Sequence, residues 1–500
     1  METHLSPWVL SLVVYLFLSL ANRIRRGSGR RLSGPARLPL FGNALQLPRK
    51  RVWMKLADLA KTYGPIYSLQ IFRTPVIVIN SVEVARELME AKSANYITRP
   101  LTKMVELSGY DNGPVLEPDA GRLRFQRKLL HAALGQGQVQ QYEDAQEYHV
   151  QTFLRNLAQD PEHYFRHIRH LAAGITIEVS HGYRVRSRDD EFVKEADIFG
   201  ENFSDAAMPN NYIVDMLPFL AVLPSFLPGM GFKRKAESYK KQYYALADRG
   251  HRWVQNEIAK GAARPSLTQI AIAEWKPGQY SEEIIMFSAT QVYTGGGDTT
   301  TVILAAFLSF MVKHPEILKK AQAEVDRVVG SERLPTVADR PNLPYVEAVF
   351  AEVFRLKAPI SLLPRLVDQD DVYNGCPIEK GTMVFVNVWG MLHDEDKYPD
   401  PHTFKPERWL GGERHPNVYP LDIAFGFGRR VCPGRHIGED FLFTAVARTI
   451  ALFNIAPGDE SSGGVLVSEL GKTFSGRPRQ RFSITPRVPN VEELVRYRGE

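Results

Sequence analysis

The sequence has few cysteines and no internal linker. Only two cysteines occur in 500 residues, which excludes a disulfide framework and indicates a reducing compartment. No Gly/Ser-rich or Pro-rich linker divides the interior and no repeat of solenoid period occurs, so the 44% of hydrophobic residues predict one large core. The formal net charge of +6 is modest. The basic residues are not interleaved with aromatic ones, which excludes a nucleic-acid partner.

A glycine-rich, basic loop surrounds one of the two cysteines. It reads FGFGRRVCPG from Phe425 to Gly434. Gly428 and Gly434 let the backbone turn tightly and approach a flat cofactor. Backbone N–H groups of the loop can point at the Cys432 sulfur and favour the thiolate, which is an anionic metal ligand. Arg430 can reach an anionic group beside the metal.

A cysteine can also be a small core residue. That alternative suits Cys376, which follows an Asn-Gly turn signal, but it suits Cys432 poorly, because packing requires no phenylalanine, glycine and arginine at these offsets. The pattern Phe-x-x-Gly-x-Arg-x-Cys-x-Gly resembles the haem-binding loop of the cytochrome P450 family. The resemblance implies a mostly α fold with small β-sheets, haem b as cofactor, and Cys432 as the thiolate ligand of its iron. The cofactor is then expected to contact Phe425, Arg430 and Gly434.

A charged pair lies in an otherwise apolar helical segment. Glu352 and Arg355 are three residues apart and share a helix face, so they can form an ion pair. An exposed pair would contribute little, but residues 345–356 leave little polar surface, and a buried pair needs further hydrogen bonds. The P450 resemblance supplies Arg408 as the third member of a structural cluster. The next residue, Trp409, stands where the family usually has Phe.

Three glycines interrupt a long helical pattern from Ser281 to Lys313. Each glycine in a helix interior costs roughly 1 kcal/mol of stability against alanine. The presence of three glycines at residues 295–297 therefore requires a structural or functional explanation. Close packing against another helix is one reason, and a groove beside a reactive centre is the other. A phosphate-binding loop is excluded, because no lysine follows the glycines and no strand precedes them. The resemblance places this segment on the distal face of haem, where Asp298 and Thr299 would handle protons during oxygen activation.

The basic residues between Arg122 and His131 could form a solvated helix face. The resemblance implies instead that Arg127 binds a haem propionate, as does Arg365. Each such charge-assisted bond is worth about 1.5–3 kcal/mol where water is excluded. The family has a Trp where this chain has Leu123, which is a departure from the pattern.

The N-terminus forms a separate unit. Residues 5–21 are apolar except for Ser, Tyr and Pro, and several arginines follow them. A helix of this length spans about 26 Å. Because positive residues stay on the cytosolic side, residues 1–21 are predicted to be a single-pass anchor with the catalytic body in the cytosol. A cleaved signal peptide fits less well, since the charge follows the apolar run. Residues 22–43 then form a basic, proline-containing hinge and residues 44–500 the haem domain.

Local patterns predict the remaining layout. Helical patterns dominate residues 281–330 and 345–357, and residues 66–72 and 75–79 form a hairpin. Residues 372–373 and 382–387 are strands that flank an Asn-Gly turn region. Residues 214–229 are apolar but interrupted by prolines, which excludes a second spanning helix. This segment is either a surface loop that contacts lipid headgroups or a core-packed connector.

The resemblance covers nearly the whole chain and implies a haem-thiolate monooxygenase in the endoplasmic reticulum membrane. It implies O2 and NADPH as co-substrates, electrons from a separate NADPH–haemoprotein reductase, cytochrome b5 as an additional partner, and hydroxylation of an apolar small molecule. The sequence looks like fungal members that modify terpenoids, polyketides or alkaloids in secondary metabolism. Two alternatives stay open. One is an enzyme that rearranges hydroperoxides, although such enzymes tend to lack the acid–alcohol pair. The other is a non-catalytic membrane haem carrier or sensor, which would need no proton relay.

Overall fold

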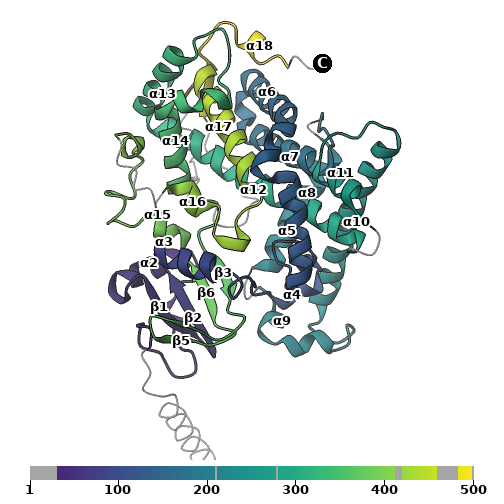
Figure 1. Cartoon of the computed structure of the whole chain (residues 1–500), viewed down its shortest axis with the longest axis vertical. Coiled ribbons are helices and arrows are strands. Elements are labelled where there is room, and N and C mark those ends of the chain that lie inside the picture. The colour runs from purple at the N-terminus through teal and green to yellow at the C-terminus, as the bar shows by residue number, and fades with distance from the viewer. Residues whose placement is uncertain are drawn as a thin grey trace, which may run out of the picture.

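The computed structural model describes residues 31–187, 189–208, 211–276, 280–411, 419–458 and 482–497. Helices dominate and small sheets complete the fold, as the sequence predicted (Figure 1). The α-helices of this part of the chain are α2 (Val52–Tyr63), α3 (Val82–Arg86), α4 (Lys103–Leu107), α5 (Ala120–Leu134), α6 (Glu143–Gln159), α7 (Tyr164–His181), α8 (Glu191–Ala207), α9 (Ile213–Met216), α10 (Gly231–Ala259), α11 (Leu267–Glu274), α12 (Glu282–Lys313), α13 (Pro315–Val328), α14 (Pro344–Leu356), α15 (Val388–Leu392), α16 (Pro420–Ala424), α17 (Arg435–Leu452) and α18 (Val491–Leu494).

The largest described sheet has the strand order β1-β2-β6-β3. Its hairpin of β1 and β2 confirms that prediction, and β6 adds parallel to β2 and antiparallel to β3. The predicted Asn-Gly turn joins β4 to β5 in a separate sheet, so the strand expected at residues 382–387 is β6 and does not pair across that turn. The strands are β1 (Ile66–Ile71), β2 (Thr74–Ile79), β3 (Leu363–Leu366), β4 (Asp371–Tyr373), β5 (Cys376–Ile378), β6 (Met383–Val386), β7 (Phe453–Pro457) and β8 (Phe482–Pro486).

Helix α12 is the central element of the fold. Glu282 and Glu283 begin it, where negative charge complements the helix dipole. It ends at Lys313, and Pro315 then occupies the first turn of α13, where proline is tolerated. The helix packs against α5, α7, α8, α10, α14 and α17. Among the described helices, α12 alone is long and apolar enough to cross a membrane, but 56% of its most apolar window is buried inside the protein. Its apolar character therefore reflects its place in the core.

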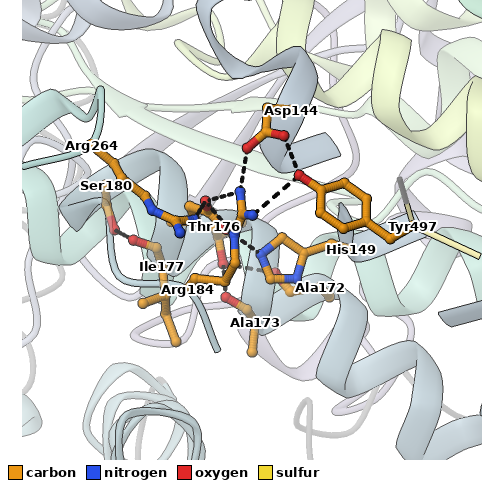
Figure 2. A network of polar contacts seen from close by, with 11 residues as sticks. Asp144, His149, Ala172, Ala173, Thr176, Ile177, Ser180, Arg184, Arg264 and Tyr497 are labelled. Carbon is orange, nitrogen blue, oxygen red and sulfur yellow. Dashed lines mark hydrogen bonds and ion pairs between the residues drawn. The ribbon is translucent and has the colours of Figure 1, made fainter. Parts of the chain in front are cut away.

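A network of charged side chains joins α6, α7 and the C-terminal segment (Figure 2). The buried carboxylate of Glu178 lies 2.8 Å from His149 Nε2 and accepts a bond from Arg184 Nε at 2.9 Å. Arg184 also donates to Asp144 at 2.6 Å, and Tyr497 donates its hydroxyl to the same carboxylate. Burial would raise the pKa of Glu178, but the bonds from His149 and Arg184 outweigh it and lower the pKa to about 2. The carboxylate therefore stays ionised and holds these elements together.

The second part of the predicted hinge lies against the sheet. Ser68 of β1 donates its N–H to Ser33 O at 2.7 Å and its hydroxyl to Leu32 O at 3.1 Å. A Cβ at Gly34 would lie only 2.0 Å from Ser68 O, so glycine is required at this close approach. The chain from about Leu32 is thus part of the globular body. The predicted anchor, residues 1–21, lies outside the described residues.

The predicted apolar segment at residues 214–229 lies largely at the surface. It includes the end of α9 and the 3-10 helix η6 (Pro218–Val222). Val222 is 85% exposed and Phe226 81% exposed, whereas Val214 is fully buried. This exposure agrees with a surface loop in which the buried side chain of Val214 packs against the rest of the protein. It does not agree with a core-packed connector.

Candidate functional site

The Cys432 loop connects α16 to α17. The N–H of Cys432 donates to Phe425 O at 2.8 Å, which closes the loop on itself. Gly428 has a φ of 60°, and a Cβ there would lie 1.8 Å from Met89 O. Only glycine therefore lets the loop rest against the π-helical turn η2 (Glu87–Ala91). Of the two glycines predicted to shape the loop, only Gly428 is required by its backbone conformation, because Gly434 has an ordinary φ of −86°.

The Cys432 thiol is accessible to solvent although it lies deep among protein atoms. Burial raises the pKa of this thiol, and the Gly434 N–H and the charges of Arg127 and Arg435 act in the opposite direction. The predicted backbone contribution is therefore present, but it does not outweigh burial. A metal cation at the sulfur would supply the remaining stabilisation of the thiolate. Within the described residues no group of three or more His, Cys, Asp or Glu could hold a bare metal ion.

The two other predicted contacts of this loop lie on different sides. Phe425 packs on Phe354 of α14, with ring centroids 5.6 Å apart, and lies near Gly438 of α17. It therefore supports the loop from α14 and α17. A Cβ placed at Gly434 would meet nothing within 4 Å beyond its own stretch of chain. The space in front of Gly434 is open, as a flat group approaching the loop requires.

Arginines gather beside the loop. Arg430 is almost fully buried, and its three guanidinium nitrogens donate to the carbonyls of Ile97, Pro114 and Glu117 at 2.6–2.9 Å. Burial, Arg99 and Arg127 lower the pKa of Arg430 to about 9. Through these carbonyl bonds Arg430 mainly stabilises the loop. Two of its five N–H groups remain free to bind an anion.

The predicted propionate ligands lie in the same cluster. Arg127 of α5 donates to Val431 O at 2.8 Å, next to the cysteine. Arg365 of β3 is 3% exposed and donates to Pro364 O. Burial lowers the pKa of Arg365, and the nearby Arg99 and Arg430 lower it further. Mutual repulsion of this kind is expected where cations converge on an anion that they share.

Arg99 belongs to this cluster and was missed from the sequence. Its buried Nε has no partner among the described residues. Burial and the charge of Arg127 lower its pKa to about 10. The only local signal at Arg99 is that it precedes Pro100, which favours an extended backbone. Nothing in the local sequence indicates that Arg99 joins the arginine cluster, because this depends on where the fold places it. Leu123, where the family has Trp, is buried at 1% exposure and has no donor to offer.

The glycines of α12 have different surroundings. A Cβ at Gly296 would lie 2.5 Å from Thr176 Cγ2, so this glycine permits close packing against α7. A Cβ at Gly295 or Gly297 would meet nothing within 4 Å beyond its own stretch of helix. The hydroxyl of Thr299 donates to Gly295 O at 3.1 Å and Gly296 O at 3.3 Å. Its lone pairs remain able to accept a hydrogen bond from a water.

Asp298 lies on a different face of α12 from Thr299. It lines a cavity with Arg169 of α7 and Asp197 of α8, and a Cβ at Gly200 would approach its Oδ2 to 3.4 Å. Burial raises the pKa of Asp298 to about 6, with Arg169 lowering it and Asp197 raising it. A carboxyl with this pKa exchanges protons readily near neutral pH.

The structure brings Glu352, Arg355 and Arg408 together. Glu352 accepts bonds from Arg355 Nε at 2.8 Å and Nη2 at 2.7 Å, and from Arg408 Nε at 3.0 Å. Both Glu352 and Arg355 are fully buried. Arg355 also donates to the carbonyls of Leu392 and Pro401. The cluster therefore ties α14 to the segment that leads to the cysteine loop.

Comparisons with known proteins agree with this geometry. The model of the cytochrome P450 family matches residues 32–464. The chain is a cytochrome P450. It is 35% identical to cytochrome P450 monooxygenase claR of Ampulloclitocybe clavipes over 98% of this chain and 92% of that protein. It is also 35% identical to cytochrome P450 monooxygenase COX2 of Coprinopsis cinerea over 93% of this chain and 91% of that protein.

Solved structures show the same fold. A zebra fish cytochrome P450 with progesterone has a TM-score of 0.71 at 20% identity and covers 87% of this chain and 99% of its own. A zebra fish cytochrome P450 with abiraterone has a TM-score of 0.68 at 21% identity, covering 87% and 100%. Members of this family are haem-thiolate monooxygenases.

The residues of this P450 fit haem. The solvent-accessible thiol of Cys432 offers the axial ligand, and the open space at Gly434 admits a flat ring. The arginine cluster, with the orphaned Nε of Arg99, offers charge-assisted donors to two carboxylates. Haem would supply the redox-active iron at which dioxygen is activated. The protein itself would supply the thiolate, the positive cluster, and the acid and alcohol on α12.

Proposed function

We propose that this P450 hydroxylates a C–H bond of an apolar small molecule, using O2 and electrons from NADPH delivered by a separate NADPH–haemoprotein reductase, with cytochrome b5 as an additional donor. In this proposal Cys432 ligates the iron, and Arg99, Arg127, Arg365 and Arg430 face the propionates. The substrate is an intermediate of terpenoid, polyketide or alkaloid secondary metabolism. The fungal relatives, which are named as monooxygenases, support the proposed reaction class.

The observation that carries the proposal is the acid–alcohol pair on α12. The hydroxyl of Thr299 donates to Gly295 O, beside the open position of Gly295, so it can accept a hydrogen bond from a water held there. Asp298 has a pKa raised to about 6 by burial, so it can supply the proton that this water passes on. An enzyme that rearranges hydroperoxides needs no such proton supply, and neither does a haem carrier.

Two exposed apolar regions support a membrane-bound enzyme. One comprises side chains of residues 213–227, and the other lies in the chain before β1 and in the β1–β2 turn. Both α9 and the β1–β2 hairpin lie at the lower end of the molecule in Figure 1. We place this end on the cytosolic face of the endoplasmic reticulum membrane, with residues 1–21 as the anchor. The exposed apolar side chains are Leu38, Leu40, Phe41, Leu45, Phe72, Ile213, Met216, Leu217, Phe219, Val222, Phe226 and Leu227.

Reconstitution with the reductase tests the reaction. The protein, the reductase and NADPH in lipid vesicles are supplied with an extract of candidate apolar metabolites under 18O2, and products are analysed by mass spectrometry. A monooxygenase incorporates one 18O atom per product and requires NADPH. Thr299→Ala should consume NADPH but form less product, since losing a positioned proton donor typically costs roughly 10²–10⁴ in rate. Products formed from hydroperoxides without NADPH would instead support the rearranging enzyme.

A further inference from the structure

The methyl group of Thr176 on α7 rests directly on the backbone of α12. A Cβ at Gly296 would lie 2.5 Å from Thr176 Cγ2 and 3.5 Å from Thr176 Cβ. The methyl group therefore occupies the space that any side chain at position 296 would take. At this point the two helices are held at a distance that depends on one threonine and one glycine.

The hydroxyl of the same threonine also reaches α12. Thr176 Oγ1 lies 2.7 Å from Ala172 O and 3.2 Å from Ala173 O within α7 (Figure 2). It also lies 3.3 Å from Tyr293 O of α12. A hydroxyl has one proton, so these carbonyls share it. The bonds within α7 are the usual ones for a helical threonine, whereas the bond to Tyr293 crosses to the other helix. In an α-helix this oxygen also accepts from the N–H of Gly297.

The α12 turn that Thr176 contacts also orients Thr299. The Thr299 hydroxyl donates to Gly295 O at 3.1 Å and to Gly296 O at 3.3 Å. Gly296 therefore receives the Thr176 methyl while its carbonyl accepts from Thr299. Glycine has no side chain that could fix its own backbone. A shift of this turn would move both carbonyls and the direction of the Thr299 hydroxyl with them.

We propose that Thr176 is a positioning residue for Thr299, acting through the backbone of α12. Its methyl group sets the distance of Gly296 from α7, and its hydroxyl holds the carbonyl of Tyr293. Rotation about χ1 moves the methyl and the hydroxyl together, so Thr176 cannot yield at Gly296 without changing its hydrogen bonds. The inference deepens the proposed monooxygenase function and rests on it for the role of Thr299.

A compensating pair of substitutions tests the methyl contact without turnover. Gly296→Ala in the full-length protein should lower haem content and melting temperature, because the added methyl meets Thr176 Cγ2. Thr176→Ser removes Cγ2 and keeps the hydroxyl, so Gly296→Ala combined with Thr176→Ser should regain most of the native haem content. The control is Gly250→Ala on α10, whose Cβ would meet His181 Nε2. Thr176→Ser should not rescue it. Equal rescue of both, or of neither, would overturn the proposed contact.

Hydrogen exchange tests the hydroxyl. Thr176→Val keeps the shape and removes the donor. In the haem protein, the amides of residues 293–300 should then exchange roughly fivefold faster, which is the effect of losing one hydrogen bond. Thr176→Ser should restore most of the protection. The matched control is Thr268→Val, since Thr268 of α11 also joins two helices but donates to Ser180 O of α7 at 2.9 Å. Native exchange rates in Thr176→Val would overturn the proposal.

A turnover measurement then connects Thr176 to the reaction. Thr176→Val should form several-fold less product per NADPH consumed, with native substrate binding, whereas Thr176→Ser and Thr268→Val should keep the native ratio. Faster exchange with an unchanged ratio would show that Thr176 only packs α7 on α12, which overturns its role for Thr299. If the reconstituted chain oxidises no substrate at all, the proposed function fails, but the exchange rates and the compensating pair still decide whether Thr176 fixes this turn.

Discussion

Trp409 donates its indole N–H to Oε2 of Glu352 at 3.0 Å. The same oxygen accepts from Arg355 Nε, and the other carboxylate oxygen accepts from Arg408 Nε and from the Lys405 N–H. A Phe at position 409, which is usual in the family, could not make this bond. The departure from the family pattern therefore adds a donor to a carboxylate that is fully buried and needs every partner it can obtain.

Trp409→Phe is accordingly expected to weaken the fold. A hydrogen bond to a charged group is worth about 1.5–3 kcal/mol, and Oε2 retains Arg355, so we expect the free energy of unfolding to fall by about 1.5 kcal/mol. Urea denaturation followed by helical circular dichroism measures it. Trp53→Phe, on α2, is the control, since among the described residues Glu352 accepts from Arg355, Lys405, Arg408 and Trp409 and not from Trp53. Equal losses in both variants would show that ring packing rather than the bond to Glu352 is responsible.

Cys432→Ser should abolish the red-shifted Soret band that the ferrous carbonyl adduct of a thiolate-ligated haem gives. The reason is that serine offers no thiolate to the iron. Cys376→Ser is the matched control, because Cys376 is buried in β5 as a packing residue, with its Sγ 4.0 Å from Asn374 O. A red-shifted band that persists in Cys432→Ser would exclude Cys432 as the axial ligand.

Arg99→Gln should weaken haem retention. Each charge-assisted bond to a carboxylate that is shielded from water is worth about 1.5–3 kcal/mol, which corresponds to a roughly tenfold or greater rise in the rate of haem loss. Transfer of haem to an excess of apomyoglobin measures that rate. Arg124→Gln changes an exposed arginine of α5 and should have no effect. An unchanged rate in Arg99→Gln would mean that the orphaned Nε faces something other than the cofactor.

The sequence predicted the elements whose signals are local. The acidic start of α12, the proline after its end and the two neighbouring strands of the β1–β2 hairpin each depend on residues a few positions apart, so short-range physics determines them. The cysteine loop was recognisable for the same reason, since its ten residues are contiguous.

What the sequence did not predict depends on distant contacts. Strand β6 was predicted as a strand, but its parallel pairing with β2, far away along the chain, was not. Arg99 joins the arginine cluster only because the fold brings it to α5 and β3. Likewise, the sequence paired Asp298 with Thr299 but gave no sign that Arg169 and Asp197 face Asp298 from other helices.

Deletion of residues 1–21 should release much of the protein from membranes while haem binding persists, because all residues proposed to hold haem lie from Arg99 onward. Residual binding should depend on the exposed apolar segment. Replacing Phe219 and Phe226 by Ser in the shortened chain should reduce sedimentation with phospholipid vesicles at least tenfold, given about 1.5–3 kcal/mol for each buried Phe. The control is Val337→Ser, because Val337 is also an exposed apolar residue, at 38% exposure, but lies outside this segment. Loss of haem on deletion would contradict an independent anchor.

The pH dependence of stability provides a check on the environment of Asp298. Burial raises the pKa of Asp298 from 3.8 to about 6, so the folded state holds this proton more tightly than the unfolded state. The cost of ionising a buried carboxyl is absent below pH 3.8, develops as the pH rises, and is complete above about pH 6. Asp298→Asn has no such cost. Its stability relative to the native chain should therefore improve between pH 4 and pH 7.

Asp339→Asn should behave in the opposite way. Arg333 lowers the pKa of Asp339, so the ionised form stabilises the folded state at neutral pH and this contribution is lost as the pH falls. Asp339→Asn should thus be destabilised at pH 7 and less so near pH 3. Urea denaturation across this pH range compares the two variants. A pH-independent effect of Asp298→Asn would mean that the carboxyl is well solvated, and a well-solvated carboxyl would already be ionised at neutral pH and could not act as the proton donor behind Thr299.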